Sequence, residues 1–416
     1  MVRNIWLGVM VVVMALPLML NADPLKLKVA AVIEEKYNDN VFFNADNEEA
    51  DFLTRFSPTV EGGRRTERTE LRLSGRPDFY YYRDTTGLNA VDQYYNGSLG
   101  HRWTERLNTT LSAGFLDDER PERELAETGL LFNTKRRQRW TCDLAGQYQA
   151  SEAMAMALSY GYQDETFDDP QYYDLRAHKV SVLLSRYLAP LLTRSTGRLQ
   201  AGYASYDYSR RYSFGNVLQT VDVDDRQSID NYSLSVGLAH SMTERMELTV
   251  DLGARLTRQQ NQARLHITDI FGGERYETNT AKEDSWGFVG SLNFEYASER
   301  SRFSLLFSHD LVPASGSNGA TERTTLRLAD EGRLTGDWYF DLAVRAYQNR
   351  SDEKDAGTDV DEFTVQLTAG LRYVFDRRWS LGSYWRSTWI DDRVVDIDKA
   401  QNTLALQLMW NWPVLE

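Results

Sequence analysis

The sequence is poor in several features that other protein classes require. Its 416 residues include 1 Cys and 5 His, which excludes a disulfide scaffold and a cysteine-based zinc site. Only one long apolar run is present and the mean hydropathy is -0.53, which excludes a bundle of transmembrane helices. Acidic residues exceed basic ones by 61 to 47, and the net charge of -14 argues against a nucleic-acid partner.

Aromatic residues, by contrast, are abundant for so polar a chain. They make up 12% of the sequence and include 10 Trp and 23 Tyr. A soluble protein of this charge would not normally carry so many. The composition therefore calls for a fold that meets both water and an apolar medium.

The single apolar run lies near the N-terminus, between Arg3 and Ala22. A positive start, an apolar core and a small residue at the end are typical of a secretory signal peptide, so we expect cleavage after Ala22. A membrane anchor is the alternative, but the run contains Pro17 and is shorter than about 18 residues. We therefore predict a signal peptide over residues 1–22 and one exported domain over residues 23–416, in which Cys142 serves as a small packing residue.

Beyond residue 22 the dominant pattern is an alternation of apolar and polar residues with period two. In residues 246–256, every even position is apolar and every odd position is polar or small. Strands produce this pattern and helices do not. It recurs in segments 154–162, 286–296, 363–375 and 404–412.

A soluble sandwich and a transmembrane barrel could both use such strands, and three features favour the barrel. The alternating segments run about 10–14 residues, longer than most soluble strands. The connections alternate between short and long, as in barrels with tight periplasmic turns. Aromatic residues gather toward the segment ends, as expected for membrane-interface girdles: Tyr80, Tyr81, Tyr82, Trp103, Trp338, Trp379, Trp389, Trp410 and Trp412.

The turn signals give the strand number. Short turns are expected at 63–65, 104–107, 151–154, 188–190, 243–246, 298–301, 336–338 and 376–379. Long loops are expected at 38–51, 84–90, 117–135, 164–176, 213–227, 260–282, 312–322, 351–360 and 391–398. Residues 117–139 could hold a loop or a strand extension. The fold predicted is all-β, a transmembrane antiparallel up-and-down β-barrel of about 18 strands in a Gram-negative outer membrane.

The polar face of these strands would line the lumen, and it is rich in arginine. Guanidinium groups on a channel wall attract anions, so one interpretation is an anion-lined conduit, for example for an acidic polysaccharide. The other is that the charges cancel in lumen salt bridges. The lumen-lining residues predicted are Arg72, Arg76, Arg102, Asp251, Arg255, Arg327, Asp341, Arg345, Arg372 and Arg386.

The predicted loops are acidic, with clusters at residues 34–51, 117–119, 168–169, 222–225 and 352–353. Such carboxylates either keep loops solvated or hold divalent cations against the phosphates of lipopolysaccharide. Their spacing lacks an EF-hand pattern. Outer-membrane lipid and lipopolysaccharide are therefore the expected partners, and no cofactor or metal is predicted.

No catalytic motif stands out. The five His residues are scattered without metal-ligand spacing, and no nucleophile elbow, P-loop or paired-His helix is present. Outer-membrane barrel enzymes exist, but their motifs cannot be recognised in this sequence. We expect a protein that is not an enzyme, with a lumen-site hydrolase as a remaining alternative.

Two short segments carry a resemblance. Residues 32–42 read VIEEKYNDNVF and residues 50–58 read ADFLTRFSP. This pair resembles the opening of a family of outer-membrane barrels encoded with bacterial exopolysaccharide systems, including those that accompany exosortase sorting. There an E-x-x-Y-[ND]-D-N strand end precedes an S/A-D-F…S-P segment, with Lys36 and Phe52 at tolerant positions. The motif covers under a tenth of the chain.

The resemblance implies a role in moving or anchoring extracellular polysaccharide, beside a polysaccharide export machinery. It identifies no substrate residues. The leading expectation is thus a channel or porin, most simply a conduit for exopolysaccharide or another hydrophilic solute. A structural barrel that anchors a surface complex is the alternative from a different class.

Overall fold

The computed structural model describes residues 25–119, 135–189, 191–215, 219–269, 271–313, 319–351 and 360–415. The expected signal peptide lies outside these ranges, and so do residues 120–134 of the segment 117–139, which was considered above as a loop or a strand extension. Within them the chain is almost entirely β-structure, with one short 3-10 helix at Thr86–Leu88. No helix in the described ranges is long and apolar enough to cross a membrane.

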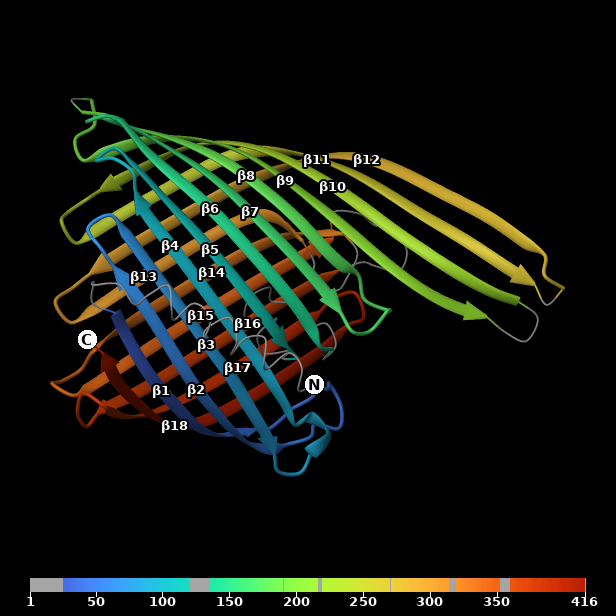
Figure 1. Ribbon diagram of the computed structural model, residues 1–416, viewed down its shortest axis with the longest axis horizontal. Coiled ribbons are helices and arrows are strands. Elements are labelled where there is room, and N and C mark those ends of the chain that lie inside the picture. Colours follow the sequence, from blue (N-terminus) through green and yellow to red (C-terminus); the bar gives the residue numbers. More distant parts are fainter. Residues whose placement is uncertain are drawn as a thin grey trace.

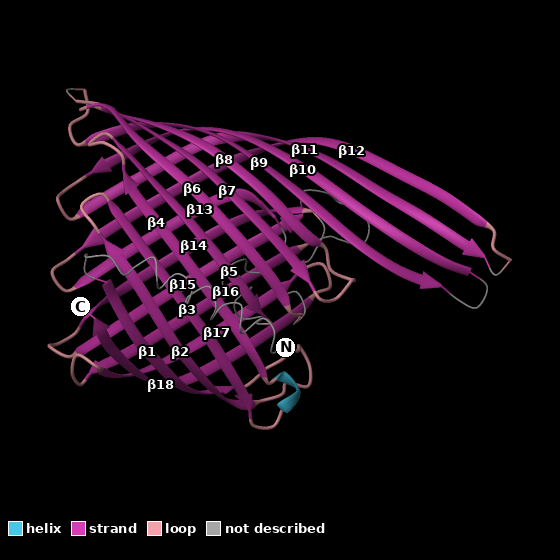
Figure 2. Ribbon diagram, in the orientation of Figure 1, coloured by secondary structure: helices cyan, strands magenta, loops and turns pink. Residues whose placement is uncertain are grey.

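The strands number 18, which confirms the predicted all-β barrel (Figures 1 and 2). Their bounds are β1 Leu25–Asn38, β2 Asp51–Arg65, β3 Thr69–Tyr82, β4 Ala90–Arg102, β5 Leu107–Asp118, β6 Arg137–Ser151, β7 Met154–Phe167, β8 Asp174–Tyr187, β9 Ser195–Gly215, β10 Gln219–Ser241, β11 Met246–Asp269, β12 Glu274–Ala297, β13 Ser301–Pro313, β14 Ala320–Arg333, β15 Trp338–Ser351, β16 Asp361–Val374, β17 Trp379–Asp392 and β18 Ile397–Leu415.

Each strand pairs antiparallel with the next one in the chain, and β1 pairs with β18 over Leu27–Asn38 to close the sheet. One predicted turn is wrong. Residues 63–65 belong to β2, and the turn follows at residues 66–68. There the hydroxyl of Thr66 accepts hydrogen bonds from the backbone N–H groups of Arg68 and Thr69, which closes the turn locally.

The outer face of the barrel carries an apolar belt. On β11 it comprises the even residues from Met246 to Leu256, and large apolar side chains in its middle are half exposed, including Leu252 at 52%. Ten residues of strand span about 33 Å, or about 25 Å across the membrane at a tilt of about 40°, which matches the apolar band of outer-membrane barrels. A continuous exposed apolar surface of this size marks a lipid-facing wall.

Aromatic residues border the belt at both ends. Toward the long loops, one transverse row contains Tyr160, Tyr203, Tyr232 and Trp286, linked by cross-strand pairing through Val180 and Leu256. Toward the short turns lie Trp103, Trp338, Trp379, Trp410 and Trp412, all at strand ends.

The expected membership of the girdle was wrong for two tyrosines. Tyr81 is exposed at 57%, but Tyr80 and Tyr82 are buried. Consecutive side chains on a strand point to opposite faces, so a run of three tyrosines cannot all meet the membrane. Tyr80 and Tyr82 instead pack with Val41 and Leu53 under the rim.

Four strands are longer than the sequence predicted. The expected loops 213–227 and 260–282 are mostly strand, because β9 to β12 run for 21 to 24 residues. These strands rise beyond the rest of the barrel as a four-stranded sheet, which extends to the right in Figure 1. Here both faces carry polar residues, so the apolar alternation fades while backbone pairing continues, as at Thr220↔Thr268.

The seam between β12 and β13 is the shortest pairing in the barrel. It runs from Gly290↔His309 to Ala297↔Arg302. Beyond Gly290, residues 274–289 of β12 pair with β11 but have no partner on their other side among the described residues. The wall is therefore continuous through the apolar belt, and β12 and β13 separate near the outer rim.

Candidate functional site

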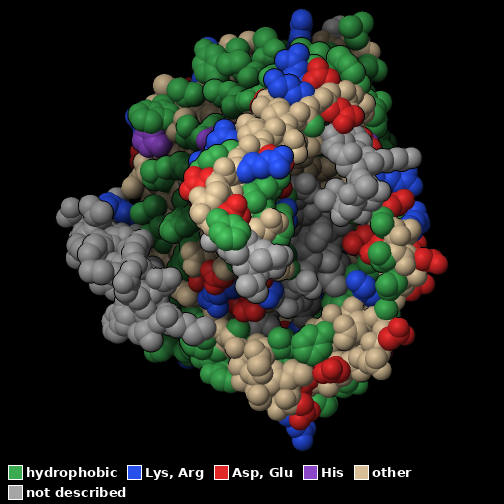
Figure 3. Space-filling model, turned by 90° about the vertical axis from the view of Figure 1, so that its right-hand side faces the viewer, with side chains coloured by type: hydrophobic (Ala, Val, Ile, Leu, Met, Phe, Trp, Pro, Cys, Tyr) green, Lys and Arg blue, Asp and Glu red, His purple; other side chains and the backbone are tan. Residues whose placement is uncertain are grey.

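The face of the sheet opposite the apolar belt carries the polar register. Residues that pair directly across neighbouring strands face the same side of the sheet. The pairing of Glu34 with Arg55, and of Arg55 with Tyr80, therefore places all three side chains on the polar face. All ten arginine and aspartate residues predicted to line the lumen lie on this face. Figure 3 views the loop end, where charges of both signs lie around the centre.

A buried ion-pair ladder crosses the inner wall near the outer ends of β1 to β7. Arg55 contacts Glu34 at 3.0 Å and Asp78 at 3.8 Å, and Arg76 contacts the same Asp78 at 3.0 Å. Further along the wall the pairs are Asp118–Arg137 at 3.0 Å and Glu165–Arg139 at 2.5 Å, while Asp117 and Arg136, at 2.7 Å, form a separate buried pair because Asp117 lies on the outward register of β5.

The acidic members of this ladder are at most 4% exposed. Buried carboxylates of this kind persist only when they are paired and hydrogen-bonded. This corrects the expectation that Asp117 and Asp118 are solvated loop acids, since both are strand residues in ion pairs. The nearness of Asp117–Asp118 to Arg136–Arg137 in the sequence was a signal, but only the strand register places Asp118 directly opposite Arg137.

Five of the ten predicted residues are engaged by other groups. Arg72 pairs with Glu70 at 2.5 Å, and Arg76 belongs to the ladder. Arg102 donates to the backbone carbonyl of Glu67, at 2.6 Å. The remaining two contacts are Asp251 with Arg198, at 3.0 Å, and Arg255 with Glu322.

The other four arginines form a row on the inner face of β14 to β17, and we call Arg327, Arg345, Arg372 and Arg386 the arginine row. Arg327 lies directly opposite Arg345, and both Arg327 and Arg386 act electrostatically on Arg345. Within the part of the chain that the structure describes, no member of the row has a carboxylate within salt-bridge distance. Arg345 donates only to the amide oxygen of Gln366, at 3.3 Å.

The row descends toward the short-turn end of the barrel. Cross-strand pairing places Arg345 beside residue 366 of β16 and Arg386 beside residue 368, and Arg372 lies on β16 itself. At about 3.3 Å per residue, the row covers about 20 Å of wall. Its cationic side chains therefore follow the direction in which a solute would cross the membrane.

Aromatic rings hold the lower members of the row. The guanidinium of Arg372 lies 5.0 Å from the ring centroid of Tyr339, and that of Arg386 lies 5.4 Å from Tyr384. Both arginines and both tyrosines line a cavity of about 820 Å³ at the short-turn end. Asp341, the tenth predicted residue, lines the same cavity and packs closely over Gly370, where a side chain would collide with its carboxylate.

The residues of the N-terminal motif build the rim. Asn40 donates to the carbonyls of Asn44 and Ala400, at 2.8 and 2.9 Å. The carboxylate of Asp51 accepts bonds from the backbone N–H groups of Phe52, Asp84 and Thr85. These contacts tie the first two outer loops and the end of β18 together, so in this structure the motif acts as a rim brace.

In the described ranges, no group of three or more His, Cys, Asp or Glu is placed to hold a metal ion. Four of the five His residues bond a hydroxyl on a neighbouring strand, namely His101 with Thr69, His178 with Tyr160, His240 with Ser195 and His309 with Thr324. They therefore serve in strand pairing.

Comparisons with known proteins give folds only. No protein-family model matches the chain, and no curated protein matches it. Among solved structures, the ferric-catecholate import receptor Fiu from E. coli K12 is 8% identical with a TM-score of 0.49, over 94% of this chain and 82% of that one. The ferric citrate transporter FecA is 9% identical with a TM-score of 0.47, over 94% and 79%. Pseudomonas aeruginosa OpdK with vanillate is 12% identical with a TM-score of 0.43, over 93% and 99%.

Proposed function

We propose that this protein is an outer-membrane channel for anionic hydrophilic solutes, and that its solute is an acidic polysaccharide chain arriving from the periplasm. The closed antiparallel barrel with an apolar outer belt is the fold of an outer-membrane protein, which fits a channel or transporter role. The function is electrostatic and steric, and no bond of the solute is broken.

The observation that supports this proposal is the arginine row. Its members are not neutralised by carboxylates, whereas the opposite wall pairs its arginines in the buried ladder. Unpaired guanidinium groups attract carboxylates and phosphates and bind them in a fork. We infer that the two interpretations left open by the sequence apply to different walls: salt-bridged near the outer ends of β1 to β7, cationic along β14 to β17.

The cavity at the short-turn end supports the polymer as solute. It combines Tyr339, Tyr384 and cationic side chains with Asp341 and Gln407. Aromatic faces and fork-shaped polar groups suit the alternating apolar and hydroxylated surfaces of a sugar ring, and the guanidinium groups suit its carboxylate. The resemblance of the N-terminal motif to barrels of exopolysaccharide systems agrees with this choice.

The test is conductance of the purified protein in a planar bilayer, in a salt gradient at low ionic strength. An arginine about 8 Å from a passing ion contributes about 0.5 kcal/mol in water, about a twofold preference. Because each arginine destabilises a cation at the same place by the same amount, the combined variant Arg327→Gln/Arg345→Gln/Arg386→Gln should lower the preference for chloride over potassium more than tenfold. Acidic oligosaccharides added on the periplasmic side should block the wild-type current, and neutral ones should not.

The matched control is Arg245→Gln, in the turn before β11. It removes the same charge from an exposed side chain that pairs with Glu299, outside the lumen. The control should keep the wild-type selectivity. A barrel without stable conductance would contradict the channel itself, and equal block by neutral and acidic oligosaccharides would contradict the acidic polymer.

One observation favours a second function, anchoring of a surface complex. The sheet formed by the outer parts of β9 to β12 exposes Phe214 at 55% and Tyr276 at 70%. Large exposed aromatic residues beyond the apolar belt are typical of contact surfaces. If the barrel is an anchor, replacing Phe214 and Tyr276 by Ser should detach a surface component from cells and leave the conductance unchanged.

A further inference from the structure

The outer ends of β13 and β14 lie inside the barrel. On β13 the apolar residues Phe303, Leu305 and Phe307 face outward, and Leu311 continues this register. Leu311 would therefore face lipid or the membrane surface, but it is only 2% exposed. Its neighbours are the side chains on the inner face of β8, β9 and β10.

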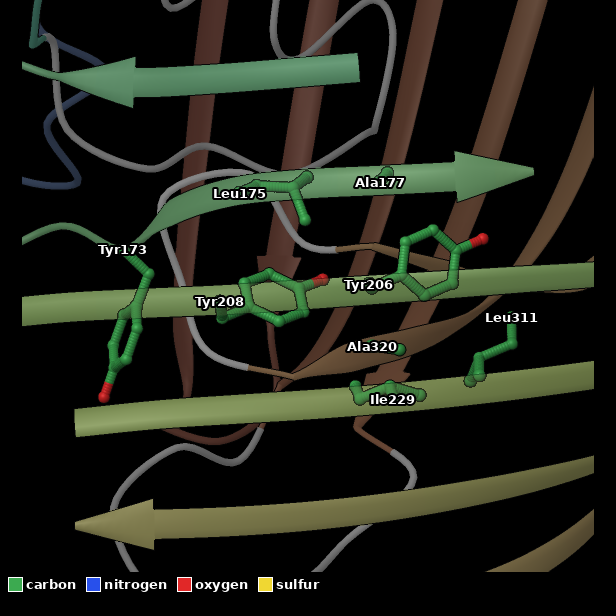
Figure 4. Close-up of a cluster of buried hydrophobic side chains, with 8 residues drawn as sticks. All are labelled: Tyr173, Leu175, Ala177, Tyr206, Tyr208, Ile229, Leu311 and Ala320. Carbon is green, nitrogen blue, oxygen red and sulfur yellow. The ribbon is translucent and has the colours of Figure 1, made fainter. Parts of the chain in front are cut away.

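Figure 4 shows this arrangement. Leu311 from β13 and Ala320 from β14 pack with Ala177, Tyr206 and Ile229. Ile229, Tyr206 and Ala177 share one face, because pairing aligns Ile229 with Tyr206 and Tyr206 with Ala177. The outward face of the ends of β13 and β14 is thus covered by the inward face of β8 to β10, so the two parts of the wall overlap.

Charged groups hold the same overlap. Arg255, on the inner face of β11, has a fully buried side chain and contacts Glu322, which lies on the outward register of β14. The charges of Lys179 on β8 and Asp310 on β13 also attract each other. The four strands β8 to β11 therefore contact the ends of β13 and β14 from outside.

The overlap explains why the β12–β13 pairing stops at Gly290↔His309. If the register continued, Phe288 would pair with Leu311 and Trp286 with Pro313. That arrangement would also bury apolar surface, since it places Leu311 beside Phe288 on the outer face. It would give partners to backbone groups of β12 that have none on that side in the described structure, a strong preference near lipid.

We propose that residues 310–313 and 320–322 form a latch with two positions. In the tucked position, seen here, Leu311 packs under β8 to β10 and the latch narrows the outer half of the lumen. In the zipped position, β13 pairs with β12 up to Trp286, the latch joins the wall and the lumen widens. This regulation rests on the proposed channel function only for its conductance readout.

Two disulfides test the latch in the full-length protein on a Cys142→Ala background. Ile229→Cys/Leu311→Cys locks the tucked position, and Phe288→Cys/Leu311→Cys locks the zipped one, because directly opposite residues bring their Cβ atoms about 4.5–5.5 Å apart. Both should form on oxidation of the folded protein in lipid, as read by gel mobility. Tyr206→Cys/Leu311→Cys replaces the first pair if that variant does not fold.

The expected result is a conductance at least twofold higher in the zipped lock than in the tucked lock, with both returning to the wild-type value after reduction. Arg255→Gln and Glu322→Gln should each shift the unlocked channel toward the zipped conductance, and Arg245→Gln should not. Failure of the zipped disulfide to form, or equal conductance of the two locks, overturns the latch. A channel silent in every form contradicts the proposed function, while the disulfide yields still decide whether the latch moves.

Discussion

The clearest consequence of the outer belt concerns Leu252 on β11. It is 52% exposed, and it lies within one residue of the midpoint of the apolar register from Met246 to Leu256. In a soluble protein, a polar substitution at a half-exposed site changes stability by less than about 0.5 kcal/mol. At the middle of a membrane wall, Leu252→Arg should destabilise the barrel by about 2–4 kcal/mol.

This energy corresponds to about a 30- to 900-fold change in the folding equilibrium, which is easily measured. Equilibrium unfolding in guanidinium chloride with lipid vesicles, followed by tryptophan fluorescence and by heat-modifiable gel migration, gives the free energy of unfolding. The reasoning also predicts a depth profile. Leu256→Arg lies beside the outer aromatic row and should cost about 0–1 kcal/mol.

The matched control is Thr249→Arg on the same strand, three residues away and on the opposite face. It places the same charge against the aqueous side and should cost much less than Leu252→Arg. If Leu252→Arg and Thr249→Arg are equally mild, the outer face does not meet lipid. If Leu256→Arg costs as much as Leu252→Arg, the belt is placed wrongly.

Two further predictions concern individual carboxylates. Asp78 is 1% exposed between Arg55 and Arg76, so Asp78→Asn should cost about 3–5 kcal/mol in the same unfolding assay. The control Asp398→Asn, at an exposed site, should leave the free energy of unfolding unchanged. A mild effect of Asp78→Asn would mean that the ladder is hydrated. Asp376 accepts hydrogen bonds from the backbone N–H groups of Arg378 and Trp379 in the β16–β17 turn, which lower its pKa below the ordinary 3.8. Its contribution is fully present above pH 3.8 and is lost as the pH falls through the lower pKa of the folded state, so wild type and Asp376→Ala should differ in stability at pH 6 and converge in strong acid. A difference that is unchanged in acid would contradict this.

The barrel and its strand number could be predicted because they depend on a local property. Each residue of a strand that faces lipid is followed by one that faces water, and segments such as 246–256 carry this alternation in full. Turn residues at segment ends then give the count. Both signals are read within about a dozen residues, so distant contacts are not needed.

The extended sheet of β9 to β12 could not be predicted in this way. Residues 222–226 read DVDDR, and their outward neighbours meet water rather than lipid. Without lipid on one side, the apolar period no longer marks the strand. What extends these strands is pairing with each other, such as Asp224 with Arg211 and with Arg264, and this pairing joins residues distant in sequence.

The lumen shows the same limit. The alternation places Arg72, Arg255 and Arg345 on one face, but it does not tell which of them meets a carboxylate. Arg255 finds Glu322 only because β14 passes beneath β11, and Arg345 faces Arg327 because of the β14–β15 register. Whether the ten residues line an aqueous path stays a prediction, since it depends on a flow of ions.

One measurement addresses the central proposal directly, namely the reversal potential of the purified wild-type channel and of Arg327→Gln/Arg345→Gln/Arg386→Gln in the same salt gradient. The account predicts an anion-selective wild type, a variant whose selectivity falls more than tenfold, and an unchanged Arg245→Gln control. A wild type that prefers cations, or a variant with the wild-type reversal potential, would contradict it.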